Sequence, residues 1–115
     1  MAIKRVNAGP RMSGAVVHGD TVYVAGQVAD TSGADVTTQT KEVLAKIDAL
    51  LKGAGTDKSK LLSTNIYITD MKNFADMNAV WDKWVSPGNT PARATVEAGL
   101  ASPEYLVEIM VVAAK

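Results

Sequence analysis

An arginine set among small and β-branched residues is the feature of this sequence that most directly suggests binding chemistry. Arg93 lies in residues 90–97, TPARATVE, which read as a strand that looks central in a sheet. Side chains alternate along a strand, so Arg93 shares one face with Thr95 and Glu97. A buried guanidinium is costly unless an anion pairs with it. Its planar fork can bind a carboxylate through two parallel hydrogen bonds, which makes Arg93 a candidate anchor for a carboxylate ligand.

Acids of the same chain offer a structural explanation for Arg93. Glu97 shares its predicted face, and Glu108 lies in the last predicted strand. Either carboxylate could pair with the guanidinium, or the long side chain could extend its charged end to solvent. The residue pattern alone leaves the ligand-binding and the structural explanations open.

The composition disfavours several other kinds of chemistry. The chain has no cysteine, which excludes a disulfide framework, a thiolate zinc site and a cysteine nucleophile. Its one histidine, His18, lies in residues 17–20 (VHGD) and is interpreted as a solvated turn residue. A histidine metal site or a Ser-His-Asp triad is therefore hard to assemble. The 12 Lys and Arg balance the 12 Asp and Glu, so no net charge attracts nucleic acid or anionic lipid.

Hydrophobic periodicity predicts the elements that must position these residues. Gly19 and Asp20 form a hairpin turn between two strands, and apolar residues three and four apart, with Asp35 as cap, indicate a helix. In the strand that follows this helix, Leu62 and Ile66 are expected on one face. The predicted elements are strands at 3–7, 14–18 and 21–28, a helix at 35–54, a strand at 60–69, a helix at 71–85, and strands at 91–99 and 105–113. This β-β-β-α-β-α-β-β order favours an α+β fold, a mixed sheet with two helices on one face.

The last predicted strand suggests an oligomer. Residues 106–113 (LVEIMVVA) are apolar on both faces apart from Glu108. A strand that is apolar on both faces needs a cover on each, whereas two helices can cover only one face of the sheet. The second face is therefore expected to pack against another copy of the chain.

Length and hydropathy favour one domain in the cytoplasm. A chain of 115 residues is the size of a single domain, spanning 1–115. No stretch approaches the ~20 apolar residues of a membrane span. The first residues, MAIKRV, lack the apolar segment of a secretory signal.

Several segments together resemble the signature of the reactive intermediate deaminase family, RidA/YjgF. The matching segments are residues 25–28 (AGQV), 73–78 (NFADMN), 91–97 (PARATVE) and 107–109 (VEI) with the apolar tail that follows. They occur in order over essentially the whole chain, and their combination is specific where each alone would be weak. The resemblance implies a fold like that of chorismate mutase of the trimeric kind. It also implies a homotrimer in which the sheets form a central barrel with the helices outside.

The resemblance implies an activity as well. In the family, the arginine that matches Arg93 binds the carboxylate of a 2-imino or 2-enamino acid in a cleft between subunits. Water then attacks the imine carbon and gives a 2-oxo acid and ammonia, with no metal or organic cofactor. The expected partners are thus a small 2-imino or 2-oxo acid and further copies of the chain. The expected catalytic residues are Arg93, Thr95 and Glu108, and the expected substrate-binding residues are Arg93, Ala94, Thr95, Gly26, Asn78 and Met110.

The chain departs from the family pattern in the residues that handle water. Met110 stands where established deaminases of the family carry a glutamate that positions the water. Glu108 shares the predicted face of Met110 but lies two residues away, about 7 Å along the strand. Ala25, Met12 and Thr95 replace a serine, a tyrosine and a cysteine of the pattern. The expected carboxylate anchor is kept, and this divergence indicates a separate branch of the family.

Two other functions compete with imine hydrolysis. The chain could be a non-catalytic module that binds a small carboxylate or regulates a partner enzyme, because methionine can neither hold nor deprotonate a water. It could also be an endoribonuclease or translation inhibitor, roles attached to some relatives. The sequence shows no basic stripe and no acid–base histidine pair, so nucleic acid is the least supported partner.

Overall fold

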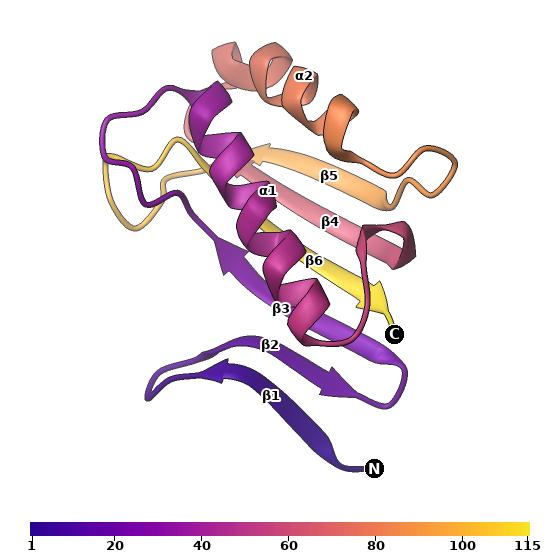
Figure 1. The fold of residues 1–115 in the computed structure, drawn as a ribbon. Coiled ribbons are helices and arrows are strands. Elements are labelled where there is room, and N and C mark those ends of the chain that lie inside the picture. Colours follow the sequence, from indigo (N-terminus) through magenta and orange to yellow (C-terminus); the bar gives the residue numbers. More distant parts are fainter.

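The chain folds into one mixed sheet with two helices across a single face, as described by a computed structural model of residues 1–115 (Figure 1). Short 3₁₀ turns at Lys58–Lys60 and Met71–Asn73 precede the fourth strand and the second helix. The predicted order of elements and the α+β class are confirmed. The elements are β1 (Ile3–Ala8), β2 (Ser13–His18), β3 (Thr21–Gln27), α1 (Val36–Gly53), β4 (Leu61–Ile68), α2 (Phe74–Trp84), β5 (Ala92–Glu97) and β6 (Val107–Ala114).

The strand order places β5 at an edge of the sheet. The order is β1-β2-β3-β6-β4-β5, so the last strand of the chain inserts between β3 and β4. Strands β4 and β5 are parallel and are joined through α2, while the other neighbouring pairs are antiparallel. The expectation that Arg93 lies on a central strand is therefore wrong. Strand β5 pairs with β4 along one edge, and the other edge of β5 has no partner within the protomer.

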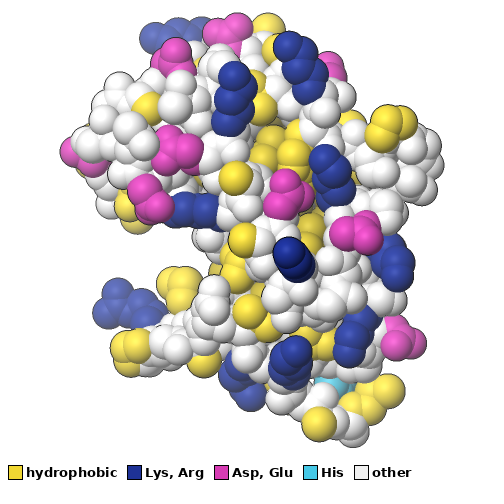
Figure 2. All heavy atoms as spheres, viewed as in Figure 1, with side chains coloured by type: hydrophobic (Ala, Val, Ile, Leu, Met, Phe, Trp, Pro, Cys, Tyr) yellow, Lys and Arg dark blue, Asp and Glu magenta, His cyan; other side chains and the backbone are white.

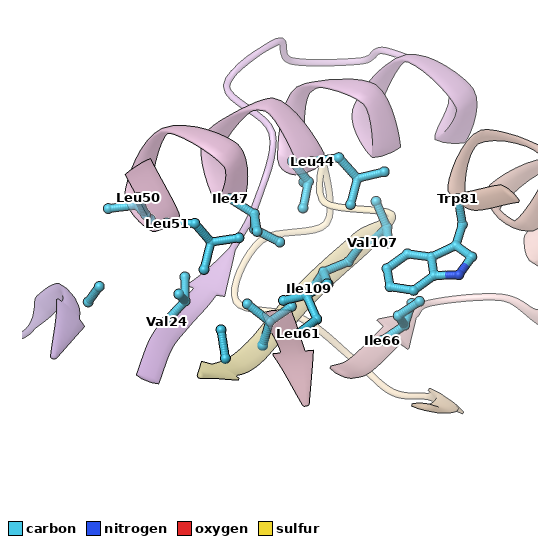
Figure 3. Packing of buried hydrophobic residues seen from close by; sticks show 14 of the residues in the cluster. Val24, Leu44, Ile47, Leu50, Leu51, Leu61, Ile66, Trp81, Val107 and Ile109 are labelled. Carbon is cyan, nitrogen blue, oxygen red and sulfur yellow. The ribbon is translucent and has the colours of Figure 1, made fainter. Parts of the chain in front are cut away.

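Helix α1 forms where its cap and its apolar spacing predict it. The side chain of Asp35 accepts a hydrogen bond of 2.8 Å from the backbone N–H of Thr38, which satisfies one of the free donors at the helix start. The apolar side chains recur three and four residues apart and all point into the core. These buried residues are Val43, Leu44, Ile47, Leu50, Leu51 and Ala54. Figure 3 labels Leu44, Ile47, Leu50 and Leu51 among them.

The prediction that Leu62 lies on the same face of β4 as Ile66 is wrong. Leu61 is 6% exposed and Leu62 is 51% exposed, the reverse of the expected alternation. Between Leu61 and Ser63 the pairing with β6 shifts, so that two steps along β4 match one step from Ala113 to Val112. Such a bulge adds one residue to the strand, so the side chains before it point to the opposite face from the one that simple alternation predicts. From Thr64 onward the predicted alternation holds.

The two faces of the sheet differ in burial. Along β6 every second residue is fully buried beneath the helices, as Val107, Ile109, Val111 and Ala113 are. The residues between them are only half-buried on the side that no helix covers. We call this side the open face. It is a largely apolar surface in which Val112 lies directly beside Tyr23 of β3 and Ser63 of β4.

A buried glutamine joins α1 to the segment that leads into β6. The side-chain amide of Gln39 donates hydrogen bonds to the carbonyl oxygens of Ala34 and Glu104, at 2.9 and 3.0 Å. Its side-chain oxygen accepts the backbone N–H of Leu106 at 2.9 Å. Gln39 therefore fixes where β6 begins, and with it the placement of Glu108 and Met110.

Replacing Gln39 with methionine is expected to lower the free energy of unfolding by about 2 to 4 kcal/mol. Methionine fills a similar volume but cannot satisfy the buried backbone groups that Gln39 binds, and an unpaired buried group costs about 1 to 3 kcal/mol. Urea denaturation followed by circular dichroism measures the change. The matched control is Lys41→Met, an exposed position on the same helix, where a change within about 0.5 kcal/mol is expected. Equal effects of the two substitutions would contradict the role of Gln39.

Candidate carboxylate-binding site

The guanidinium of Arg93 lies on the helix-covered side of the sheet, against two aromatic rings of α2. Arg93 pairs in register with Thr64 of β4, a fully buried residue on that side. The guanidinium carbon stands 5.5 Å from the ring centre of Trp81 and 6.0 Å from that of Phe74. Both distances are those of cation–π contacts. Because β5 is an edge strand, the side chain is half-buried rather than enclosed.

No acid of the same chain neutralises Arg93. The ion pairs of the protomer are Lys46–Asp30 and Lys72–Asp70. Glu97 shares the face of Arg93 as predicted, but its side-chain oxygen accepts the backbone N–H of Met71 at 2.9 Å. Glu108 lies on the open face, opposite Tyr67. The structural explanation in which Glu97 or Glu108 pairs with Arg93 is therefore wrong.

Three of the four buried side-chain polar atoms without a hydrogen-bond partner lie on the strands and the helix that surround Arg93. They are the hydroxyl oxygens of Thr64 and Thr95 and the side-chain oxygen of Asn78. Thr95 follows Arg93 by two residues on the same face of β5, and Asn78 lies between Phe74 and Trp81 in α2. Buried polar groups are normally paired, so this grouping is a mark of a binding site. Arg93, Thr95 and Asn78 form the group that we call the arginine cluster.

Three of the remaining predicted residues form a second group on the open face. Glu108 and Met110 lie there, opposite Tyr67 and Asn65 of β4. Gly26 lies in a bulge where β3 pairs with β6, and a Cβ atom on it would stand only 3.0 Å from the carboxyl carbon of Glu108. Gly26 thus leaves room for that carboxylate. We call Gly26, Glu108 and Met110 the open-face cluster.

The protomer does not bring the two clusters together. Strand β4 separates β5 from β6, and the clusters lie on opposite faces of the sheet. Ala94 belongs with neither, because its side chain is exposed and points to the open face opposite Asn65. A single site that contains both clusters therefore requires two copies of the chain, each contributing one of them.

The aromatic residues beside Arg93 were missed as functional candidates. Phe74 and Trp81 belong to the apolar stripe of the second helix, and that stripe alone indicates core packing. The available signal was the position of Asn78 between them, in a segment that resembles the family. At the positions of the family's serine and tyrosine, Ala25 is half-buried on β3 and Met12 is exposed in the loop between β1 and β2.

The largest cavity of the protomer lies elsewhere. It is a groove of about 470 Å³ between α1 and α2, lined by Leu44, Val80 and Trp84 among others. Figure 2 shows this face, where hydrophobic side chains between the helices are flanked by lysines and acids. The groove contains no residue of either cluster. The arginine cluster is therefore an open edge rather than a closed pocket in one protomer.

The structure contains neither a cluster of metal-binding side chains nor a helix that could span a membrane. No group of three or more histidine, cysteine, aspartate or glutamate side chains is placed to hold a metal ion. None of the helices has the length and apolar character needed to cross a membrane.

Comparison with known proteins places the chain in a family. The model of the family described as Endoribonuclease L-PSP matches residues 2–115. The RutC family protein YoaB of Escherichia coli is 46% identical over 114 residues, covering 99% of each chain. A RutC family protein of Haemophilus influenzae is 44% identical over 114 residues, covering 98% of each.

Solved structures agree with this placement. A YjgF family member from Neisseria meningitidis superposes with a TM-score of 0.97 at 45% identity, covering 100% of this chain and 96% of the other. The Rid family protein YyfA from Yersinia pestis gives 0.92 at 32% identity, covering 99% and 100%. The match spans the strands that hold both clusters, and the chain belongs to the RidA/YjgF family, which includes the RutC proteins.

Proposed function

We propose that the protein is a deaminase of small 2-imino and 2-enamino acids, which it hydrolyses to a 2-oxo acid and ammonia. The observation that supports this most directly is the state of Arg93. Its guanidinium has no acid partner and stands over two aromatic rings. An arginine in this state has its N–H donors available for the carboxylate of a ligand.

The site is proposed to form between two subunits of a homotrimer. One subunit contributes the arginine cluster and the next contributes the open-face cluster. The apolar open face supports such an assembly, because Val112 and its neighbours are covered by no element of their own protomer. Three sheets that meet through this face would form a central barrel with the helices outside.

The reaction needs orientation more than a strong catalyst. Arg93 binds the substrate carboxylate and thereby fixes the adjacent C2 atom. Water adds across the C2=N bond, so that its oxygen bonds to C2 and one proton moves to nitrogen. The C2–N bond then breaks, ammonia leaves with the hydroxyl proton, and C2 becomes a carbonyl. An enamino acid first takes up a proton at C3 and releases one from its nitrogen, which gives the imine. Because the imine is already reactive, placing the water and the substrate supplies most of the needed acceleration.

Glu108 is the proposed group that holds the water. Its carboxylate lies over Gly26 on the open face and forms no ion pair. Such a carboxylate can accept a proton from water or orient it. Thr95 and Asn78 are proposed to bind the polar atoms at C2, since their side-chain oxygens have no partner in the protomer. Met110 and the backbone of Ala94 would line the cleft.

The test is imine hydrolysis by the purified protein. A threonine dehydratase generates 2-iminobutanoate in place, and the appearance of 2-oxobutanoate and ammonia is followed over time. The wild-type protein is expected to raise the rate above spontaneous hydrolysis in proportion to its concentration. An equal amount of an unrelated protein serves as the control. A hydrolysis rate that does not change with protein concentration would refute the proposed deaminase activity.

A second function is favoured by Met110. A thioether can neither deprotonate nor firmly hold a water, so the site could bind a 2-oxo or 2-imino acid without turning it over. This binding module would take up 2-oxobutanoate in calorimetry and show no acceleration in the assay above. The two functions share Arg93 and differ only in turnover.

A further inference from the structure

We propose that Trp81 is a positioning residue that holds the guanidinium of Arg93 ready for a carboxylate, with Phe74 as its partner. This inference rests on the proposed function, because it assigns a role at the same site. It goes beyond that function by naming what replaces an acid in orienting the arginine.

The contact geometry supports this role. The guanidinium carbon of Arg93 lies 5.5 Å from the Trp81 ring centre and 6.0 Å from that of Phe74. An aromatic face attracts a cation through its quadrupole. Unlike a carboxylate, it does not occupy the N–H donors of the fork. The rings can therefore hold the side chain in place while its hydrogen-bonding groups stay free for a ligand.

The two rings differ in how firmly they are held. Trp81 is 5% exposed and Phe74 is 39% exposed. Figure 3 shows the indole of Trp81 lying over Ile66 of β4, and its ring centre is 5.3 Å from that of Trp84. Trp81 is thus a rigid surface, whereas Phe74 is at the edge of the protein. The rigid ring is the one expected to determine the position of Arg93.

Ordering the Arg93 side chain before the ligand binds matters because an arginine side chain is flexible. A free arginine side chain loses considerable rotamer freedom when it binds a ligand. A side chain that is already ordered by stacking loses less, and the ligand binds more tightly for the same hydrogen bonds. Removal of the indole should therefore weaken binding although Trp81 itself touches no ligand.

The experiment measures the affinity of the full-length protein for 2-oxobutanoate by calorimetry. Trp81→Leu is expected to weaken binding about 10-fold and Phe74→Leu about threefold. Trp81→Phe keeps a ring and should restore binding to within about threefold of wild type. The matched control is Val80→Ala, which removes buried apolar atoms from the same helix on the side that faces α1 and should leave the affinity unchanged. Circular dichroism verifies folding, and Phe74→Leu, at an exposed position, tests the proposal should Trp81→Leu not fold.

The outcomes separate this inference from the proposed function. A wild-type protein that does not bind 2-oxobutanoate refutes the proposed function. The role of Trp81 is then refuted as well, because it depends on that function. A wild type that binds, with Trp81→Leu and Phe74→Leu binding equally well, overturns the positioning role alone. Equal weakening by Trp81→Leu and Val80→Ala also overturns it, because the effect would then come from the stability of the helix.

Discussion

Replacing Arg93 with alanine is expected to weaken the binding of 2-oxobutanoate about 100-fold or more. Truncating one partner of a hydrogen-bonded charge pair costs about 2 to 5 kcal/mol, which corresponds to roughly 30-fold to several thousand-fold in affinity. Arg93→Lys keeps the charge but loses the planar fork, so we expect an intermediate loss of about 10-fold. Calorimetry with 2-oxobutanoate measures all three proteins.

The position of Arg93 makes this substitution a clean test. Arg93 forms no ion pair and lies on an edge strand, so its removal breaks no salt bridge that stabilises the fold. The substitution does remove the contacts with Trp81 and Phe74, each worth about 0.5 to 1 kcal/mol, so the thermal unfolding midpoint should fall by only a few degrees. Lys52→Ala, at an exposed position on α1, removes the same charge away from the open face and should leave the affinity unchanged. Equal affinities of Arg93→Ala and wild type would show that the arginine is not the carboxylate anchor.

The elements that were predicted well are those determined by local sequence. Helix α1 follows from the cap at Asp35 and from apolar residues at helical spacing, and both are local signals. The hairpin of β2 and β3 follows from Gly19, whose φ of 61° lies in the region that glycine adopts easily. Each of these signals is complete within one segment, so the sequence of that segment is enough to read it.

The features that were missed depend on contacts between distant segments. The edge position of β5 follows from the insertion of β6 between β3 and β4, which no local pattern in residues 91–99 reveals. The bulge at Leu62 appears only in the pairing of β4 with β6. The contact of Arg93 with Trp81 joins β5 to α2. Periodicity correctly placed Arg93, Thr95 and Glu97 on one face, but it could not tell which face the helices cover.

Replacing Val112 with aspartate is expected to break the proposed homotrimer. Val112 lies on the central strand β6, within the apolar open face and directly beside Tyr23. An interface over this face would bury the new carboxylate in each of the three subunits with no cation beside it. An isolated buried charge costs several kcal/mol, and the threefold arrangement repeats that cost in every subunit. Sedimentation velocity should give three times the 12.1-kDa protomer mass for wild type and a single protomer mass for Val112→Asp.

The control and the binding measurement extend the test from assembly to the site itself. Ala45→Asp adds the same charge on the exposed side of α1, outside the open face, and should remain trimeric. Because the arginine and open-face clusters lie on opposite faces of one protomer, a dissociated chain cannot complete a cleft from both. Val112→Asp should therefore also lose 2-oxobutanoate binding, although it retains Arg93. A monomeric Val112→Asp protein that binds as tightly as wild type would show that the arginine cluster alone forms the site, and the intersubunit cleft would be wrong.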